Sequence, residues 1–269
     1  MFDIGSRLLS TAVVAVLLGL GVVAVSPAQG LAASPAPSGV IWQADPALGA
    51  AANFAGLETA PGSITVANDP QGRFGPSFRY QTMQNHGVKS RAESRGMRLP
   101  NGSVYTLGTA VEGQTFFLGW RALWNPMPIT RGAWIAFFQL HMDGAGSSSG
   151  GGPIALRTLG DGQLHFQLVT PRGGSTHIWS APLSLNTWNT FVIGFRLSRT
   201  SSIGWVEFWY NGVQQRFTNG AMQYPAATLI NSFVNTKWGV YRSGANHGGV
   251  AVAYMNHATL GRSYADVAP

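Results

Sequence analysis

The chain of 269 residues is 45% hydrophobic and 11% aromatic, with nine tryptophans, which supports a packed core and excludes a disordered chain. It contains no cysteine, so disulfide bonds and thiolate zinc sites are excluded as well. The net charge of +7 at pH 7 favours a polyanionic partner, and because the basic residues are scattered, a basic cleft fits better than a nucleic-acid-binding tail.

The N-terminal segment predicts export. Arg7 precedes an apolar run over residues 8–25, and small residues follow, among them Ala32 and Ala33. This order is typical of a secretory signal peptide, which we expect at residues 1–33; an uncleaved anchor is the alternative. An Ala/Ser/Pro linker over 34–39 and one domain over 40–269 complete the predicted organisation. We expect a secreted, extracellular monomer with no membrane association after cleavage.

From residue 40 onward, short alternating runs of apolar and polar residues are separated by glycine and proline, which is typical of an all-β protein. We expect a short helix near 46–54 and strands at 114–123, 133–141, 162–169, 190–198, 205–210, 213–217 and 249–260. Asn211-Gly212 is the preferred two-residue hairpin turn. The pattern predicts two antiparallel sheets packed as a single-domain β-jelly roll.

The segment 143–153 is almost entirely glycine, serine and alanine. Two interpretations stay open for it. It is either a flexible connection between strands or a mobile flap beside a cleft, since long glycine-rich loops in compact domains are often functional.

A cation-rich pattern occupies residues 89–95. The period of two in a strand places Lys89, Arg91, Glu93 and Arg95 on one face. Three cations around one carboxylate suit the capture of an anionic ligand. A solvated ladder of salt bridges is the alternative.

Two further polar patterns lie on expected strands. Gln139 and His141 point the same way, opposite Trp134, Ala136, Phe138 and Leu140. A side-by-side amide and imidazole is a candidate functional pair, and a polar rim at the end of the strand is the alternative. Lys237, Gly239 and Tyr241 share a face, and the glycine leaves room for something to approach the backbone closely. An ordinary strand capped by a tyrosine is the alternative there.

Together and in this order, the three patterns resemble the signature strands of jelly-roll alginate lyases, and the wider sequence is similar to the related glucuronan- and heparin-lyase-type proteins. The wider marks are Gly119-Trp120, Phe138-Gln139-Leu140-His141, Trp188-Asn189, Gly204-Trp205 to Asn211-Gly212, and Gly239-Val240-Tyr241-Arg242. The resemblance runs from Val40 to the C-terminus. It implies a concanavalin A-like sandwich and a polysaccharide lyase that cleaves an acidic, uronate-containing polymer of glucuronan or alginate type by β-elimination.

The resemblance also implies roles for residues. Arg91, Gln139 and His141 form a clamp on the substrate carboxylate, Tyr241 is the catalytic acid and a candidate base, and His141 is the other candidate base. Substrate-binding residues are Lys89, Glu93, Arg95 and Lys237, with Glu93 expected to orient the arginines. We expect no required cofactor and no catalytic metal, because His141 and Asp143 offer only two ligands; a structural calcium ion stays open.

Two other functions stay open on the same fold. A non-catalytic carbohydrate-binding module could stack sugars on Trp205, Trp209 and Tyr210. A glycoside hydrolase needs a pair of carboxylates, and the chain lacks the Glu-x-Asp-x-x-Glu spacing that such sandwich enzymes commonly use. The phenol of Tyr241 opposite a Gln/His pair favours the lyase.

Overall fold

The computed structural model describes residues 39–84, 87–143, 151–169, 174–245 and 247–269. The predicted signal peptide and most of the predicted linker lie outside these residues, as does the central part of the glycine-rich segment. No helix among the described residues has the length and apolar character needed to cross a membrane.

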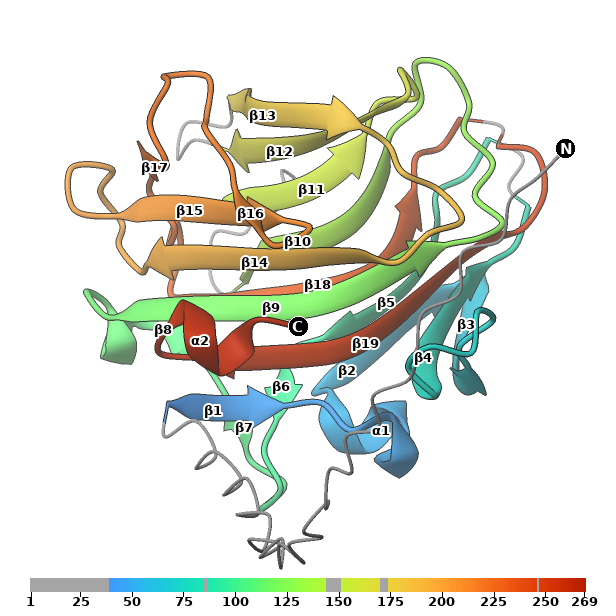
Figure 1. Ribbon diagram of the computed structural model, residues 1–269, viewed down its shortest axis with the longest axis horizontal. Coiled ribbons are helices and arrows are strands. Elements are labelled where there is room, and N and C mark those ends of the chain that lie inside the picture. Colours follow the sequence, from blue (N-terminus) through green and yellow to red (C-terminus); the bar gives the residue numbers. More distant parts are fainter. Residues whose placement is uncertain (1–38, 85–86, 144–150, 170–173, 246) are drawn as a thin grey trace, which may run out of the picture. The chain divides into compact units, whose positions relative to one another are not determined.

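Two large antiparallel sheets make up the fold (Figure 1). The nine-stranded sheet consists of β1 (Val40–Gln43), β3 (Gly62–Asn68), β4 (Pro76–Thr82), β9 (Thr115–Trp124), β14 (Asn189–Arg196), β15 (Trp205–Tyr210), β16 (Val213–Gln214), β17 (Gln223–Pro225) and β19 (Ala251–Gly261). Its strand order is β16-β15-β14-β9-β19-β4-β3, with β1 beside β19 and β17 beside β15.

The eight-stranded sheet carries the groove described below. It consists of β2 (Gly56–Ala60), β5 (Ser90–Arg95), β8 (Leu107–Gly108), β10 (Ile135–Asp143), β11 (Ile154–Thr158), β12 (Gln163–Val169), β13 (Ser175–Pro182) and β18 (Phe233–Arg242). Its order is β13-β12-β11-β10-β18-β5-β2, with β8 beside β18. Strands β5 and β10 are therefore joined only through β18, a strand from near the C-terminus.

The remaining elements are short. Strands β6 (Met97–Arg98) and β7 (Val104–Tyr105) pair with each other, and the helices are two 3₁₀ turns at Pro46–Leu48 and Thr109–Val111 with α1 (Ala50–Asn53) and α2 (Tyr264–Val267). The predicted helix near 46–54 is confirmed as a 3₁₀ turn followed by α1. Helix α2 begins at a capping box, in which Ser263 and Asp266 satisfy each other's backbone N–H groups.

Aromatic side chains join the two sheets. Trp120 of β9 stacks across the layers on Phe138 of β10 with ring centroids 4.6 Å apart, and within its own sheet on Phe191 of β14 at 5.2 Å. All three rings are at most 2% exposed. Truncating a buried aromatic residue of this kind typically costs about 3–5 kcal/mol, so these contacts fix the two layers against each other. The predicted β-sandwich of jelly-roll type is confirmed.

The strongly alternating strands lie where the sequence predicts them. Strand β15 has the predicted bounds, and the turn residues Asn211 and Gly212 have φ angles of 51° and 79°, as a two-residue hairpin turn requires. The returning strand β16 ends at Gln214 and is therefore shorter than the predicted 213–217. Phe217 lies beyond the strand and is buried in the core at 3% exposure.

Strand β10 breaks the predicted alternation. Trp134 and Ala136 were expected on the apolar face, but both line the groove together with Gln139. The register shifts against both neighbouring strands between Ala136 and Phe138, so that Phe137 and Phe138 are both buried in the core. This irregularity is a β-bulge, which re-aims the side chains before it by one residue.

Candidate active site

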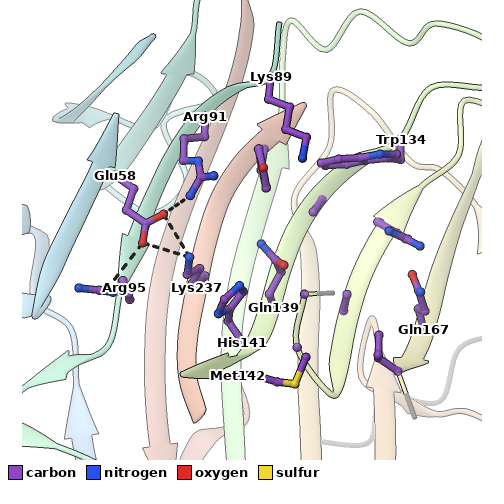
Figure 2. A pocket seen from close by; sticks show the side chains of 17 residues that line it. Glu58, Lys89, Arg91, Arg95, Trp134, Gln139, His141, Met142, Gln167 and Lys237 are labelled. Atoms are coloured by element: carbon purple, nitrogen blue, oxygen red, sulfur yellow. Dashed lines mark hydrogen bonds and ion pairs between the residues drawn. The ribbon is translucent and has the colours of Figure 1, made fainter. Parts of the chain in front are cut away.

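A groove of about 670 Å³ crosses the outer face of the eight-stranded sheet (Figure 2). Its side chains come from β2, β5, β18, β10, β11 and β12 and from the residues that flank them. The lining residues are Glu58, Lys89, Arg91, Arg95, Trp134, Ala136, Gln139, His141, Met142, Gly151, Gly152, Ala155, Arg157, Gln167, Val169, Lys237 and Tyr241. Every site residue predicted from the sequence except Glu93 is among them.

Strand pairing brings these distant residues together. Lys237 of β18 is the register partner of Arg95 on one side and of Gln139 on the other. Tyr241 is likewise the partner of Arg91. Register partners on adjacent strands have Cβ atoms about 4.5–5.5 Å apart and share a face of the sheet. The three sequence patterns therefore form two rows across the groove, with the pair Gly239 and Glu93 between them.

Glu58 of β2 organises the cations and was not predicted from the sequence. Its carboxylate forms an ion pair with Arg91, lies 3.0 and 3.1 Å from the Lys237 Nζ, and is 3.7 Å from the Arg95 Nε (Figure 2). Burial alone would raise the pKa of Glu58, but the hydrogen bonds and charges of Lys237 and Arg91 outweigh it and hold the pKa below its usual value. Glu58 thus stays ionised and holds three cations at one end of the groove.

The contacts of Lys237 leave little of it for a substrate. The residue is 4% exposed, and its ammonium group bonds both oxygens of Glu58. A buried ammonium group needs such a partner, because an isolated charge in the interior is costly. Lys89, by contrast, is exposed at the rim of the groove.

Glu93 was predicted to bind substrate and to orient the arginines, and the structure corrects both expectations. It is 1% exposed and does not line the groove, so substrate does not reach it. Its Oε1 accepts a hydrogen bond of 2.7 Å from Gln139 Nε2, while the arginines are paired to Glu58. Burial raises the pKa of Glu93 to about 7, even though Lys237, Gln139 and Arg91 act to lower it. Glu93 therefore positions the amide of Gln139.

The ring of Tyr241 is held on two sides. The guanidinium carbon of Arg91 lies 4.2 Å from its centroid, and Trp134 packs edge-on at 5.0 Å with an interplanar angle of 85°. Burial would lower the pKa of Arg91, but the hydrogen bond to Glu58 and the nearby Tyr241 and Glu93 raise it. Arg91 thus stays charged against the ring of the tyrosine.

Gly239 was predicted to allow a close approach to the backbone, and the group that approaches is the neighbouring strand rather than a ligand. A Cβ at this position would lie 2.1 Å from the carbonyl oxygen of Ala92 and 2.9 Å from the ring of Tyr80. Its φ of 141° also lies in the region that favours glycine. The glycine keeps β18 in register between Lys237 and Tyr241.

The aromatic residues of the alternative carbohydrate-binding interpretation do not form one surface. Trp209 packs on Tyr264 of α2, with centroids 4.9 Å apart. The next residue, Tyr210, packs on Phe191 and Trp179 at 5.5 Å on the other side of the strand. A flat stacking platform of the three predicted rings is therefore absent.

The polysaccharide lyase family matches residues 48–258 of the chain. No curated protein matches the sequence.

Three solved structures show a similar fold. Endo-β-1,4-glucuronan lyase from the fungus Trichoderma reesei superposes with a TM-score of 0.62 at 14% identity, over 80% of this chain and 94% of that chain. Alginate lyase A1-II′, a member of polysaccharide lyase family 7, gives 0.52 at 16% identity, over 74% and 83%. The marine family 7 alginate lyase AlyA1 from Zobellia galactanivorans gives 0.50 at 17% identity, over 76% and 85%.

Proposed function

Because the chain belongs to the polysaccharide lyase family, we propose that it cleaves a uronate-containing anionic polysaccharide, of glucuronan or alginate type, by β-elimination. The observation that carries the proposal is the grouping of Arg91, Gln139, His141 and Tyr241 around one cation-rich groove. The three solved structures named above are a glucuronan lyase and two alginate lyases, which agrees with this substrate class.

The reaction sets the demands on the site. A base removes the proton from C5 of the uronate, the C5–H electrons form the C4=C5 double bond, and the C4–O4 bond breaks. The C5 proton is hardly acidic while the adjacent carboxylate is charged. Donors placed on that carboxylate stabilise the enolate-like intermediate, because they lie where negative charge develops. Arg91 and the amide of Gln139, with His141, suit this role.

Tyr241 is our candidate for the acid that protonates O4. Arg91 and Trp134 hold its ring, so the position of the phenol is fixed relative to the carboxylate clamp. General acids work best when held within hydrogen-bond reach of the atom they protonate. Tyr241 and His141 both line the groove. If Tyr241 is the base, its phenolate oxygen takes the C5 proton and then delivers it to O4; if His141 is the base, it keeps the C5 proton and the phenol of Tyr241 supplies the proton that O4 receives.

The two rival functions fit less well. Membership of a lyase family sets aside a purely carbohydrate-binding module. A hydrolase needs two available carboxylates. Glu58 lines the groove, but its carboxylate is held in ion pairs with Arg91 and Lys237. Glu93 lies next to it on the sheet but is 1% exposed.

We also propose that the enzyme is exported as an extracellular monomer and needs no cofactor. The signal-like segment at residues 1–33 supports export. The arginine and amide donors in the groove can neutralise the substrate carboxylate without a metal ion. A chelator should accordingly leave turnover unchanged.

Incubation of the purified protein with a panel of polyuronates tests the function. We expect ultraviolet-absorbing unsaturated ends to appear with glucuronan or alginate. Polymer cleavage that yields reducing ends without this absorbance would indicate hydrolysis and overturn the proposal. Binding of a polyuronate without any cleavage would support the carbohydrate-binding function instead.

A further inference from the structure

The groove continues beyond the residues so far discussed. On the side of β10 away from Glu58 it is lined by Arg157 of β11 and Gln167 of β12 (Figure 2 labels Gln167). Neither residue belongs to the patterns that the lyase resemblance uses.

Arg157 differs from the other cations of the groove in its partners. Arg91, Arg95 and Lys237 share the carboxylate of Glu58, whereas no acidic side chain of the described residues forms an ion pair with Arg157. Its Nε is buried, and the described part of the chain offers it no acceptor. Burial lowers the pKa of Arg157, with no carboxylate to oppose it. Among the residues that the structure describes, Arg157 therefore presents to the groove a positive charge that no carboxylate offsets.

The neighbours of Arg157 do not supply that carboxylate. Its register partner is His165, which bonds Asp161 at 2.8 Å and stacks on His177 at 4.6 Å. Asp161 is thus engaged by His165, and its side chain does not line the groove.

Gln167 is a second, independent sign of a ligand site. The residue is 3% exposed and lines the groove, yet its Oε1 has no donor within the described residues. Buried polar atoms are usually hydrogen-bonded, so an acceptor of this kind in the wall of the groove suits a ligand that carries a donor. A sugar hydroxyl is a donor of the right kind.

The spacing suits a polymer. The register runs from Arg91 through Tyr241 and Ala136 to Arg157, and from Gln139 through Ala155 to Gln167. At about 4.8 Å between strands, the backbones of Arg157 and Gln167 lie about 14 Å from Arg91 and about 10 Å from Gln139. One unit of a 1,4-linked polymer spans roughly one strand spacing, so the distance corresponds to two or three sugars.

We propose that Arg157 and Gln167 form a further sugar subsite for a second uronate of the same polymer, whose carboxylate pairs with Arg157 and whose hydroxyl donates to Gln167 Oε1. The inference rests on the proposed lyase function and adds a requirement on substrate length and charge. It predicts that the enzyme prefers oligomers that reach from the clamp to this subsite.

Size-graded oligouronates test the subsite. Arg157→Ala should lower kcat/KM by roughly 10- to 100-fold on oligomers long enough to reach it, since hydrogen bonds to charged groups contribute about that much, and should leave the shortest cleavable oligomers unaffected. Arg157→Lys should recover part of the loss, and Gln167→Leu should show a smaller loss with the same length dependence. Arg216→Ala is the matched control, because Arg216 is an exposed arginine outside the groove.

The outcomes separate the two proposals. Wild-type protein without lyase activity on any polyuronate overturns the proposed function. In that case, calorimetric binding of a long oligouronate still tests the subsite, because Arg157→Ala should weaken it. A loss that is equal on short and long oligomers, or no loss on long ones, in variants with unchanged melting temperature overturns the subsite.

Discussion

At the scale of single residues, the charge of the groove is organised by one acid. Arg91, Arg95 and Lys237 would repel one another on adjacent strands, and the carboxylate of Glu58 holds all three in place. The cluster keeps an excess of positive charge, because three cations face one carboxylate. A substrate carboxylate therefore meets cations that are already positioned, which reduces the ordering that binding requires.

Two variants separate acid catalysis from carboxylate binding. Tyr241→Phe removes one hydroxyl and keeps the ring, so the contacts with Arg91 and Trp134 should persist. We expect it to bind polymer but to lose roughly 10²–10⁴-fold in kcat, the range of a general acid or base. Arg91→Ala should lower kcat and raise KM together, because the clamp acts in both the ground state and the transition state.

Steady-state kinetics and polymer binding by calorimetry measure this contrast. A folded Tyr241→Phe protein with full turnover would remove Tyr241 from the mechanism and leave His141 as the remaining proton-transfer group.

Glu93 predicts a pH dependence of stability. A glutamate ordinarily titrates near 4.5, and burial raises the pKa of Glu93 to about 7 in the folded chain. Between these pH values the folded state retains a proton that the unfolded state has lost, so stability falls as pH rises from about 4.5 to 7. At about 1.4 kcal/mol per unit, the loss is on the order of 3 kcal/mol.

Glu93→Gln should abolish that loss, because the amide can still accept from Gln139 Nε2 but does not titrate. The measurement is urea unfolding of wild type and variant across this pH range. The difference between the two free energies of unfolding should shift in favour of the variant as pH rises. Parallel curves would show that Glu93 titrates as an ordinary glutamate.

At the scale of elements, the register of β18 depends on Gly239. An alanine there would place a Cβ 2.1 Å from Ala92 O at a φ of 141°, so strand β18 would have to move away from β5. We expect Gly239→Ala to lower the free energy of unfolding by about 1–3 kcal/mol, the usual cost of overpacking, with a further cost from the backbone.

Gly248→Ala is the matched control, because a Cβ at Gly248 meets no heavy atom within 4 Å. We expect its effect to stay within about 0.5 kcal/mol, as for ordinary surface substitutions. Chemical denaturation compares the two. Equal effects would mean that β18 tolerates a side chain at position 239.

The elements also show what the sequence could and could not predict. Strand β15 was predictable, because it buries one face and its burial alternates along the chain. Strand β14 was predictable from its aromatic and β-branched residues, although both of its faces are buried from Phe191 to Phe195. The bulge in β10 was not, because it follows from register against two other strands rather than from local sequence. Glu58 was missed because Gly56–Ala60 has no apolar alternation and pairs with β5 across about thirty residues of chain.

At the scale of the whole molecule, the net charge of +7 predicts salt-sensitive binding of a polyanion. Screening acts over about 8–10 Å near physiological salt. This is shorter than the distance of about 14 Å between the backbones of Arg91 and Arg157, two arginines at opposite sides of the groove. KM for the polymer should rise several-fold from low to high ionic strength while kcat changes little. A KM indifferent to ionic strength, measured with two different monovalent salts, would mean that the positive charge serves another purpose.

The central place of β18 in its sheet has a consequence for how the enzyme matures. Strands β2 and β5 supply Glu58 and Arg91 early in the chain, and β10 supplies Gln139 and His141 later, but the two groups meet only when β18 pairs with both. Pairings so distant in sequence form slowly, because a long loop must close before any contact is gained. A chain still being synthesised therefore holds separate halves of its groove, and catalytic competence arrives once β18 has emerged and paired with both β5 and β10.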